Sequence, residues 1–156
     1  MLILLGSACS SGTKTSSRSS ASVTVDRVVD GDTLVLIIDG KKEKVRLIGI
    51  DTPETVKPNT PVQCYGLEAS LALKAMLPAG TKVRIERDEE ARDRYQRLLL
   101  YVYRQADDVF VNLQLVQQGF ARIMSIAPNT AHAPYFAAAA NAANAAAIGL
   151  WGACPR

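Results

Sequence analysis

A β-rich run over residues 22–50, interrupted by two Asp-Gly dipeptides, constrains the fold more than any other part of the sequence. Its side chains are largely β-branched and alternate with polar ones, which is the two-residue period of a strand. The dipeptides are Asp30-Gly31 and Asp39-Gly40, and the second is typical of a tight two-residue hairpin. The sequence therefore predicts three strands, over residues 22–29, 33–38 and 42–50.

Two further strands and three helices are predicted after this run. Residues 82–87 alternate apolar and charged side chains and residues 98–103 are continuously apolar, which indicates two strands around a charged connection. Helical periodicity, with Gly or Pro near the ends, predicts helices over residues 65–77, 109–118 and 132–147. This order predicts an α+β fold that is mainly a β-barrel with helices. Its simplest packing is an OB-fold, a five-stranded, partly closed barrel with three helices, of a kind that often binds oligonucleotides.

The first 22 residues are predicted to lie outside the folded domain, which would span residues 23–156. An apolar start followed by Gly6-Ser7-Ala8-Cys9 resembles a signal peptide with a lipobox, so Cys9 is a candidate for lipidation. Residues 10–22 contain seven Ser and two Thr, which is typical of a flexible tether. We expect an exported bacterial protein, extracellular or held in the cell envelope by a lipid anchor. The alternative is a disordered N-terminus left by a misassigned start.

The two remaining cysteines, Cys64 and Cys154, are an even pair in a chain that we expect to reach an oxidising compartment. A disulfide between them would close a loop of 90 residues. On the chain-entropy account, such a bridge stabilises the fold by roughly 4 kcal/mol. The alternative is two unrelated small buried side chains. With one His, three Cys and no Cys-x-x-Cys pair, the chain has too few ligands for a zinc ribbon or finger.

The net charge does not by itself indicate a nucleic-acid partner. The chain has 18 basic and 15 acidic residues, but Lys14 and Arg18 lie in the N-terminal segment, which leaves 16 basic residues against 15 acidic ones. A nucleic-acid partner therefore has to be argued from where the charges lie.

Four carboxylates at two strand ends are candidate metal ligands. Asp30 and Asp32 lie at the first strand junction, and Asp51 and Glu54 follow the third predicted strand. Carboxylates gathered without neighbouring bases favour a hard cation, and calcium accepts six to eight oxygen ligands in irregular geometry. Each motif alone has a structural alternative. Asp30-Gly31 could form only a hairpin turn, and Asp51 with Glu54 could form a helix capping box.

Arg46 and Arg97 are the complementary cations. Arg46 precedes Asp51 by five residues in the predicted strand, and Arg97 lies in the charged connection. Guanidinium groups stay protonated and bind phosphate oxygens in pairs, so two of them facing a carboxylate-bound divalent ion would form a phosphodiester site. The alternative for each arginine is a solvated surface charge.

Five motifs in order along residues 23–151 resemble the thermonuclease family, the staphylococcal nuclease-like domains. The motifs are Val29-Asp30-Gly31-Asp32-Thr33-Leu34, Val45-Arg46-Leu47-Ile48-Gly49-Ile50-Asp51-Thr52-Pro53-Glu54, Tyr65-Gly66-x-Glu68-Ala69, Asp93-Arg94-Tyr95-x-Arg97 and Gly149-Leu150-Trp151. The resemblance implies an OB-fold and calcium-dependent hydrolysis of DNA and RNA to products that end in a 3′-phosphate.

Carried over position by position, the resemblance implies a metal site. Asp32 and Asp51 would bind Ca²⁺ through their carboxylates, and Thr52 would bind it through its main-chain oxygen. Asp30 would have a secondary role, through a water ligand or a hydrogen bond.

The resemblance also implies the catalytic and substrate-binding residues. Glu54 would hold and deprotonate the attacking water, while Arg46 and Arg97 would stabilise charge on the phosphoryl oxygens. Arg94 and Tyr95 resemble the family's contacts to a terminal phosphate.

Two departures from the family pattern concern substrate contacts. Gln96 stands where the family usually has Gly, which affects the direction of Arg97, and Met124 and Ile126 stand in a stretch where some members carry tyrosines that stack on a base. We expect a monomer that acts on accessible single strands of DNA or RNA and touches a membrane only through a lipid anchor. The alternative function is a non-catalytic module of the same fold that binds nucleic acid or protein.

Overall fold

The computed structural model describes residues 22–55, 59 and 61–155. Residues 1–21, which include Cys9 and nearly all of the predicted signal and tether segment, lie outside the described residues. Within them the elements run in the order β1 (Val23–Asp30), β2 (Thr33–Ile38), β3 (Lys41–Leu47), β4 (Gly49–Asp51), α1 (Gly66–Met76), β5 (Val83–Glu86), β6 (Leu98–Arg104), β7 (Val109–Phe110), α2 (Val111–Gln117), β8 (Arg122–Met124), α3 (Ala133–Ala145) and α4 (Leu150–Ala153).

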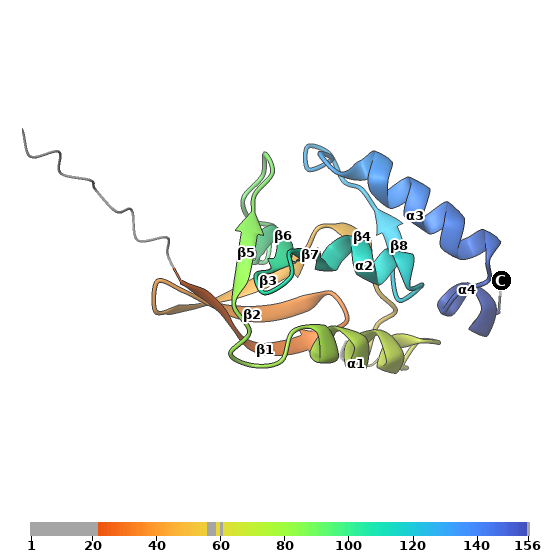
Figure 1. Ribbon diagram of the computed structural model, residues 1–156, viewed down its shortest axis with the longest axis horizontal. Coiled ribbons are helices and arrows are strands. Elements are labelled where there is room, and N and C mark those ends of the chain that lie inside the picture. The colour runs from red at the N-terminus through yellow and green to blue at the C-terminus, as the bar shows by residue number, and fades with distance from the viewer. Residues whose placement is uncertain (1–21, 56–58, 60, 156) are drawn as a thin grey trace, which may run out of the picture.

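Five strands form a curled sheet in the order β1-β2-β3-β6-β5, and β7 adds to β6 (Figure 1). Neighbouring strands are antiparallel except for the parallel pair of β3 and β6. The start of β5 returns to β1, where Thr24 bridges Lys82 and the Val25 amide donates to the Thr81 carbonyl over 2.9 Å. This contact closes the sheet into a barrel, so the predicted α+β class and the five-stranded OB-type barrel are confirmed.

The two Asp-Gly turns lie where the sequence predicts them. Ile38 pairs with Lys41 across Asp39 and Gly40, whose φ angles of 50° and 77° are those of a two-residue hairpin turn. Asp30 pairs with Thr33 across Gly31 and Asp32, so the first junction is also a two-residue hairpin turn.

The predicted strand over residues 42–50 is wrong in one respect, because it divides in two. β3 ends at Leu47, and Gly49 has a φ of 81°, a left-handed conformation that glycine adopts without the strain a side chain brings. β4 then leaves the barrel and pairs with β8 in a separate two-stranded sheet. In a straight strand Arg46 and Asp51 would lie about 17 Å apart. The bend at Gly49 is what allows their side chains to meet.

Other elements differ from prediction at their ends. Val109 and Phe110 extend the sheet as β7, where the sequence predicted the start of a helix, and the last long helix ends at Ala145. The short elements β8 and α4 were not predicted. Three or four residues carry too little periodicity to identify an element, so these depend on their tertiary partners.

The core lies inside the barrel and between the barrel and its helices. Leu34, Leu47 and Leu100 fill the barrel, and Leu73 of α1 and Phe136 of α3 pack against it from outside, all of them fully buried. Each such side chain contributes about 1.5–3 kcal/mol to folding. α1 runs along the β1 and β2 side, while α2 lies between the barrel and α3 (Figure 1).

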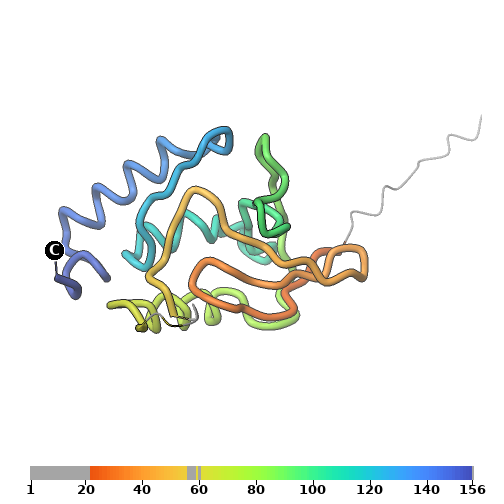
Figure 2. The backbone as a smooth tube through the Cα atoms, turned by 180° about the vertical axis from the view of Figure 1, so that it is seen from behind, coloured from red at the N-terminus to blue at the C-terminus, as the bar shows by residue number. Residues whose placement is uncertain are grey.

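The molecule is elongated, and its two ends differ in structure. The β2–β3 hairpin lies at one end of the long axis and the C-terminal helix α4 at the other, as both views show (Figures 1 and 2). No helix within the described ranges combines the length and the hydropathy that crossing a bilayer requires.

Candidate active site

A cavity of about 500 Å³ opens where the β1–β2 turn, β3 and the segment after β4 meet. It gathers most of the residues that the sequence singled out, from residues 29–54 and from the connection between β5 and β6. Its lining consists of Val29, Asp30, Asp32, Thr33, Lys44, Arg46, Asp51, Thr52, Glu54, Arg94 and Arg97. Of the predicted catalytic, metal and substrate residues, Tyr95 alone does not line it.

Arg46 of β3 lines this cavity, and its side chain is only 13% exposed. Its Nη1 donates to the main-chain oxygens of Leu47 and Ile50, over 2.6 and 3.0 Å. Its Nη2 donates to Asp51 Oδ1 over 3.0 Å and lies 3.1 Å from Asp32 Oδ2. The guanidinium is therefore held on both sides of the bend at β4, with its charge between two carboxylates.

Asp32 is buried, and its two carboxylate oxygens have different neighbours. Oδ2 accepts hydrogen bonds from the main-chain amide and the hydroxyl of Thr52, over 3.1 and 3.0 Å, and Oδ1 accepts one from the Thr33 hydroxyl over 3.0 Å. These bonds tie the β1–β2 turn to the segment after β4. The two strand ends that carry the acids are therefore held side by side.

Asp51 is the more accessible acid, with a side chain that is 46% exposed. Burial raises the pKa of its carboxyl, Arg46 opposes this, and the nearby carboxylates of Asp32 and Glu54 raise the pKa further. Burial together with the neighbouring acids thus outweighs the effect of Arg46 on this carboxyl, and a bound cation would stabilise its ionised form.

The donor set suits a hard divalent cation such as calcium. The cavity lining contains no His or Cys, and its candidate ligands are the carboxylates of Asp32 and Asp51 and the main-chain oxygen of Thr52. Among the described residues no group of three or more His, Cys, Asp or Glu side chains is gathered closely enough to form a ligand set by itself. Main-chain oxygens and water would complete the shell, which calcium accepts readily.

Asp30 and Glu54 also line the cavity, and Thr55 contacts both of them. Asp30 is buried, and its Oδ1 accepts hydrogen bonds from the Gly31 amide over 2.8 Å and the Thr55 hydroxyl over 2.5 Å. Glu54 Oε1 accepts one from the Thr55 amide over 3.0 Å. Residues 52–54 are not helical, so the capping-box alternative for Asp51 and Glu54 does not apply.

Arg97 reaches the same cavity from the connection between β5 and β6. Its Nε donates to Asp93 Oδ2 over 2.7 Å, and its main-chain amide donates to Asp93 Oδ1 over 3.0 Å. Gln96 adopts a φ of 64°, the left-handed conformation in which glycine is favoured. The turn of this connection is thus formed without the family's usual glycine, and Asp93 sets the direction of Arg97.

Three arginines, Arg46, Arg94 and Arg97, line both this cavity and a second one of about 510 Å³. Arg94 lines both cavities and donates through Nη2 to the Tyr95 hydroxyl over 2.7 Å. Tyr95 is 64% exposed and, with Met124 and Ile126, gives the second cavity a largely apolar lining.

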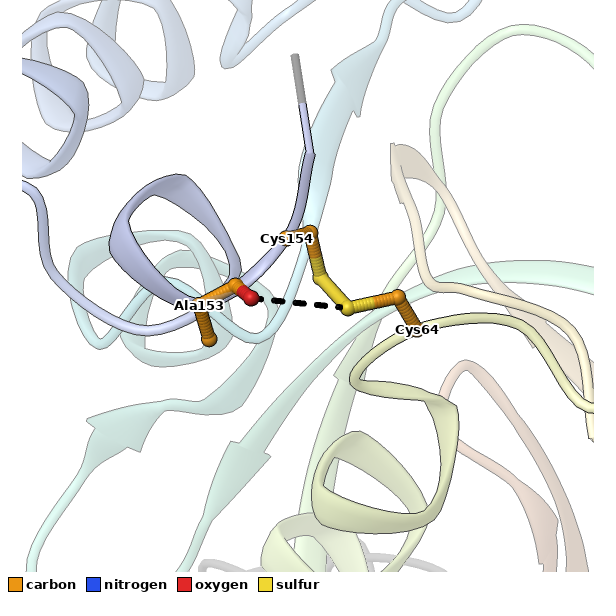
Figure 3. Close-up of a disulfide and its surroundings, with 3 residues drawn as sticks. All are labelled: Cys64, Ala153 and Cys154. Atoms are coloured by element: carbon orange, nitrogen blue, oxygen red, sulfur yellow. Dashed lines mark hydrogen bonds between the residues drawn. A yellow bond between two sulfur atoms is a disulfide. The ribbon is translucent and has the colours of Figure 1, made fainter.

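The two cysteines that the sequence pairs form a disulfide in the structure, with their Cα atoms 5.8 Å apart (Figure 3). Cys64 lies just before α1, and Cys154 follows α4. The bridge joins the end of the loop that carries Glu54 to the end of the chain.

Lys44 is a cavity residue that the sequence analysis missed. It precedes Arg46 by two residues in β3, so both side chains lie on the same face of the strand. That spacing is a signal in the sequence that could have identified it. It adds an ammonium group to the three arginines of the cavity lining, Arg46, Arg94 and Arg97.

Comparison with known proteins agrees with this geometry. A family model described as "Staphylococcal nuclease homologue" matches residues 44–153. A thermonuclease of Staphylococcus intermedius is 45% identical over 127 residues, which cover 81% of this chain and 74% of that protein. A thermonuclease of Staphylococcus hyicus is 50% identical over 105 residues, covering 67% of this chain and 60% of the relative. Endonuclease YncB of Bacillus subtilis is 41% identical over 131 residues, covering 83% of this chain and 61% of the relative.

Proposed function

The chain belongs to the staphylococcal nuclease family, and we propose that it is a calcium-dependent nuclease that hydrolyses phosphodiester bonds in DNA and RNA and leaves 3′-phosphate ends. The observation that supports this most is the convergence of acids and arginines on one cavity. Asp32, Asp51 and Glu54 come from two strand ends, and Arg46 and Arg97 face them from two other segments.

The metal would be held by Asp32, Asp51 and the main-chain oxygen of Thr52. When bound, the ion polarises a phosphoryl oxygen and helps to orient the attacking water. Arg46 keeps both carboxylates in place through the contacts described above. Because Arg46 also donates to two main-chain oxygens, its guanidinium is oriented before the reaction begins.

Glu54 would act as the general base. To leave a 3′-phosphate, water attacks the phosphorus atom, the P–O5′ bond breaks, and the departing 5′ oxygen takes up a proton. Glu54 lines the cavity beside the proposed metal ligands and takes the proton from the water as the new P–O bond forms.

Arg46 and Arg97 would stabilise the negative charge that develops on the phosphoryl oxygens. Both guanidinium groups are fixed before substrate binds, one by the β3–β4 bend and the other by Asp93. Donors fixed in this way are each worth several kcal/mol in a transition state. Arg94, which lines the same cavity, would bind a neighbouring phosphate.

The proposed substrate is an accessible single strand, bound by a monomer. Exposed aromatic and apolar side chains can stack on or pack against unpaired bases, and Tyr95, Met124 and Ile126 offer such a surface next to the charged cavity. We also propose that the protein is exported, because a Cys64–Cys154 disulfide suits an oxidising compartment. Lipidation of Cys9 remains part of this proposal, and it rests on the N-terminal sequence alone.

The experiment compares wild type and Glu54→Gln on denatured DNA and on RNA, with calcium and with a chelator. We expect cleavage that requires calcium, and a loss of roughly 10²–10⁴-fold in kcat when the base is removed. The new 5′ ends should be hydroxyls, so polynucleotide kinase should label them without prior phosphatase treatment. Glu68→Gln, which changes an exposed glutamate of α1, is the matched control and should retain activity.

Two results would contradict the proposal in different ways. Binding of nucleic acid without calcium-dependent cleavage would support the non-catalytic module. Cleavage that Glu54→Gln leaves unchanged would keep the nuclease and remove the role of Glu54.

A further inference from the structure

We propose that Gln63 is a positioning residue for Glu54, and that the Cys64–Cys154 disulfide holds Gln63 in place. The inference rests on the proposed function, because that function gives Glu54 its role as the base. It adds a link between the segment that carries Glu54 and the C-terminal end of the chain.

Gln63 forms two hydrogen bonds with the main chain of Glu54. The Glu54 amide donates to Gln63 Oε1 over 2.9 Å, and the Gln63 amide donates to the Glu54 carbonyl over 3.0 Å. One residue thus engages both main-chain polar groups of the proposed base. Because these two bonds fix the backbone of Glu54, they also fix the point from which its carboxylate reaches the cavity.

The segment that carries Gln63 packs directly against the segment that carries Glu54. A Cβ atom at Gly66 would lie 3.1 Å from the carbonyl oxygens of both Pro53 and Glu54 and 2.8 Å from Thr55 Cγ2. The Gly66 amide donates to the Gln63 carbonyl over 3.0 Å. A shift of residues 63–66 would therefore be transmitted to residues 53–55.

The disulfide links this segment to the end of α4, close to the C-terminus. Cys64 follows Gln63 directly, and its sulfur lies 3.9 Å from the Ala153 carbonyl oxygen as well as being bonded to Cys154 (Figure 3). α4, which ends at Ala153, is itself fixed, because Leu150 is fully buried and its amide donates to the Gly119 carbonyl over 2.9 Å.

The anchor matters because residues 61–64 are all exposed. Hydrogen bonds at an exposed site exchange readily with water, so Gln63 holds Glu54 effectively only if its own position is restrained. By contrast, Asp32 is held by buried hydrogen bonds from Thr52, and Arg46 by part-buried ones to the Leu47 and Ile50 carbonyls. Loosening Gln63 should therefore disturb the base and leave the proposed metal ligands in place.

The test is a mutant cycle that combines Cys64→Ser/Cys154→Ser with Gln63→Met, a substitution that keeps the length of the side chain and removes its acceptor. Assays on denatured DNA at saturating calcium, at a temperature at which circular dichroism shows each variant folded, give kcat and KM. We expect kcat to fall tenfold or more in each variant, since a displacement of about 1 Å can cost 10²-fold. KM and the calcium Kd should change by less than about threefold, because substrate and metal contacts lie elsewhere.

Coupling between the two changes is the decisive result. If the disulfide acts through Gln63, kcat of the combined variant should be at most about twofold lower than kcat of the less active of the two separate variants. Independent effects on kcat would instead multiply. Exchange of the Glu54 amide should accelerate in both variants. Gln105→Met, which changes an exposed glutamine in the β6–β7 connection, is the matched control and should alter neither kcat nor this exchange.

Two outcomes would overturn the inference while leaving the nuclease proposal intact. These are an unchanged kcat in either variant, with activity still dependent on Glu54, and multiplying effects in the combined variant. If the serine variant does not fold, Gln63→Met decides alone, because it retains the bridge and must still lower kcat and speed exchange at Glu54. If wild type shows no Glu54-dependent cleavage, the proposed function fails. The positioning of Glu54 by Gln63 is then tested by hydrogen exchange alone, and unchanged exchange of the Glu54 amide in the variants would overturn it.

Discussion

Arg46 is the residue on which the candidate site depends most. Its guanidinium contacts two main-chain oxygens and two carboxylates, and these partners lie on both sides of the β3–β4 bend. A planar group with five donors can satisfy such a set at once, whereas a lysine ammonium is a single point of charge on a flexible stem. The structure therefore requires arginine at this position, and a positive charge alone would not replace it.

The substitution Arg46→Lys tests this requirement. We expect kcat to fall by roughly 10²–10³-fold, as when one preorganised donor is removed from a transition state. The free energy of unfolding should fall by about 1–3 kcal/mol, because buried main-chain oxygens lose their partner. Steady-state kinetics at saturating calcium and urea unfolding measure the two effects.

The control is Arg27→Lys, which changes an arginine that is 61% exposed and whose ion pair among the described residues is with the neighbouring Asp26. It should leave both quantities nearly unchanged. Activity of Arg46→Lys within twofold of wild type would show that charge alone is sufficient.

At the scale of elements, the connection between β5 and β6 depends on a turn around Asp93. The carboxylate of Asp93 accepts hydrogen bonds from the Tyr95 and Arg97 amides and from Arg97 Nε. Burial by itself would raise the pKa of Asp93, but the bonds from Arg97 and Tyr95 outweigh it and lower the pKa below its ordinary value. Asp93 therefore stays ionised and keeps Arg97 directed at the cavity.

Gln96 completes this turn with a φ of 64°, which favours glycine. The left-handed conformation costs a residue with a Cβ roughly 1–2 kcal/mol, and glycine avoids this cost. Glycine loses more conformational entropy on folding, however, which offsets about 0.5–1 kcal/mol of the gain. We therefore expect Gln96→Gly to raise the free energy of unfolding by up to about 1 kcal/mol. Urea unfolding measures this change.

Gln105→Gly is the control, since Gln105 is not among the described residues with positive φ. It should leave the stability unchanged or lower it. A loss of stability in Gln96→Gly as large as in this control would indicate that the turn carries no strain that glycine relieves.

At the scale of the whole molecule, a set of acids ties α3 to the barrel. Glu86 of β5 accepts a hydrogen bond from the Tyr103 hydroxyl over 3.0 Å and lies 2.8 Å from His132 Nε2, just before α3. Asp88 accepts hydrogen bonds from the Tyr101 hydroxyl and the Ala131 amide, over 2.9 and 3.0 Å. Burial raises the pKa of Tyr103 to about 12, so its hydroxyl remains a donor to Glu86.

These contacts predict loss of stability in acid. Burial alone would raise the pKa of Glu86 and of Asp88, but the hydrogen bonds outweigh it, and both values lie below the ordinary 4.5 and 3.8. A carboxyl with a lowered pKa in the folded state stabilises the fold above its unfolded pKa, and this contribution is lost as pH falls through the folded value. We expect the free energy of unfolding to decline below about pH 4.5.

Urea unfolding between pH 3 and 7 checks this, with Glu86→Gln/Asp88→Asn as the test variant. The variant should be less stable at pH 7 and lose less stability on acidification. Asp39→Asn/Glu68→Gln changes two exposed acids outside this set and should keep the wild-type slope. If the free energy of unfolding falls as steeply on acidification in the test variant as in wild type, other carboxyls are responsible for the decline.

The sequence by itself determined the order of strands and helices and the identity of the acids at the strand ends. Alternation, helical periodicity and the Asp39-Gly40 turn are local properties, because they follow from backbone geometry over a few residues. Only the tertiary structure decided how the site is assembled. The bend at Gly49 returns Asp51 to Arg46, and Gln63 meets Glu54 across nine residues. Such partners are selected by packing between distant segments, and no short-range pattern in the sequence encodes the distance between them.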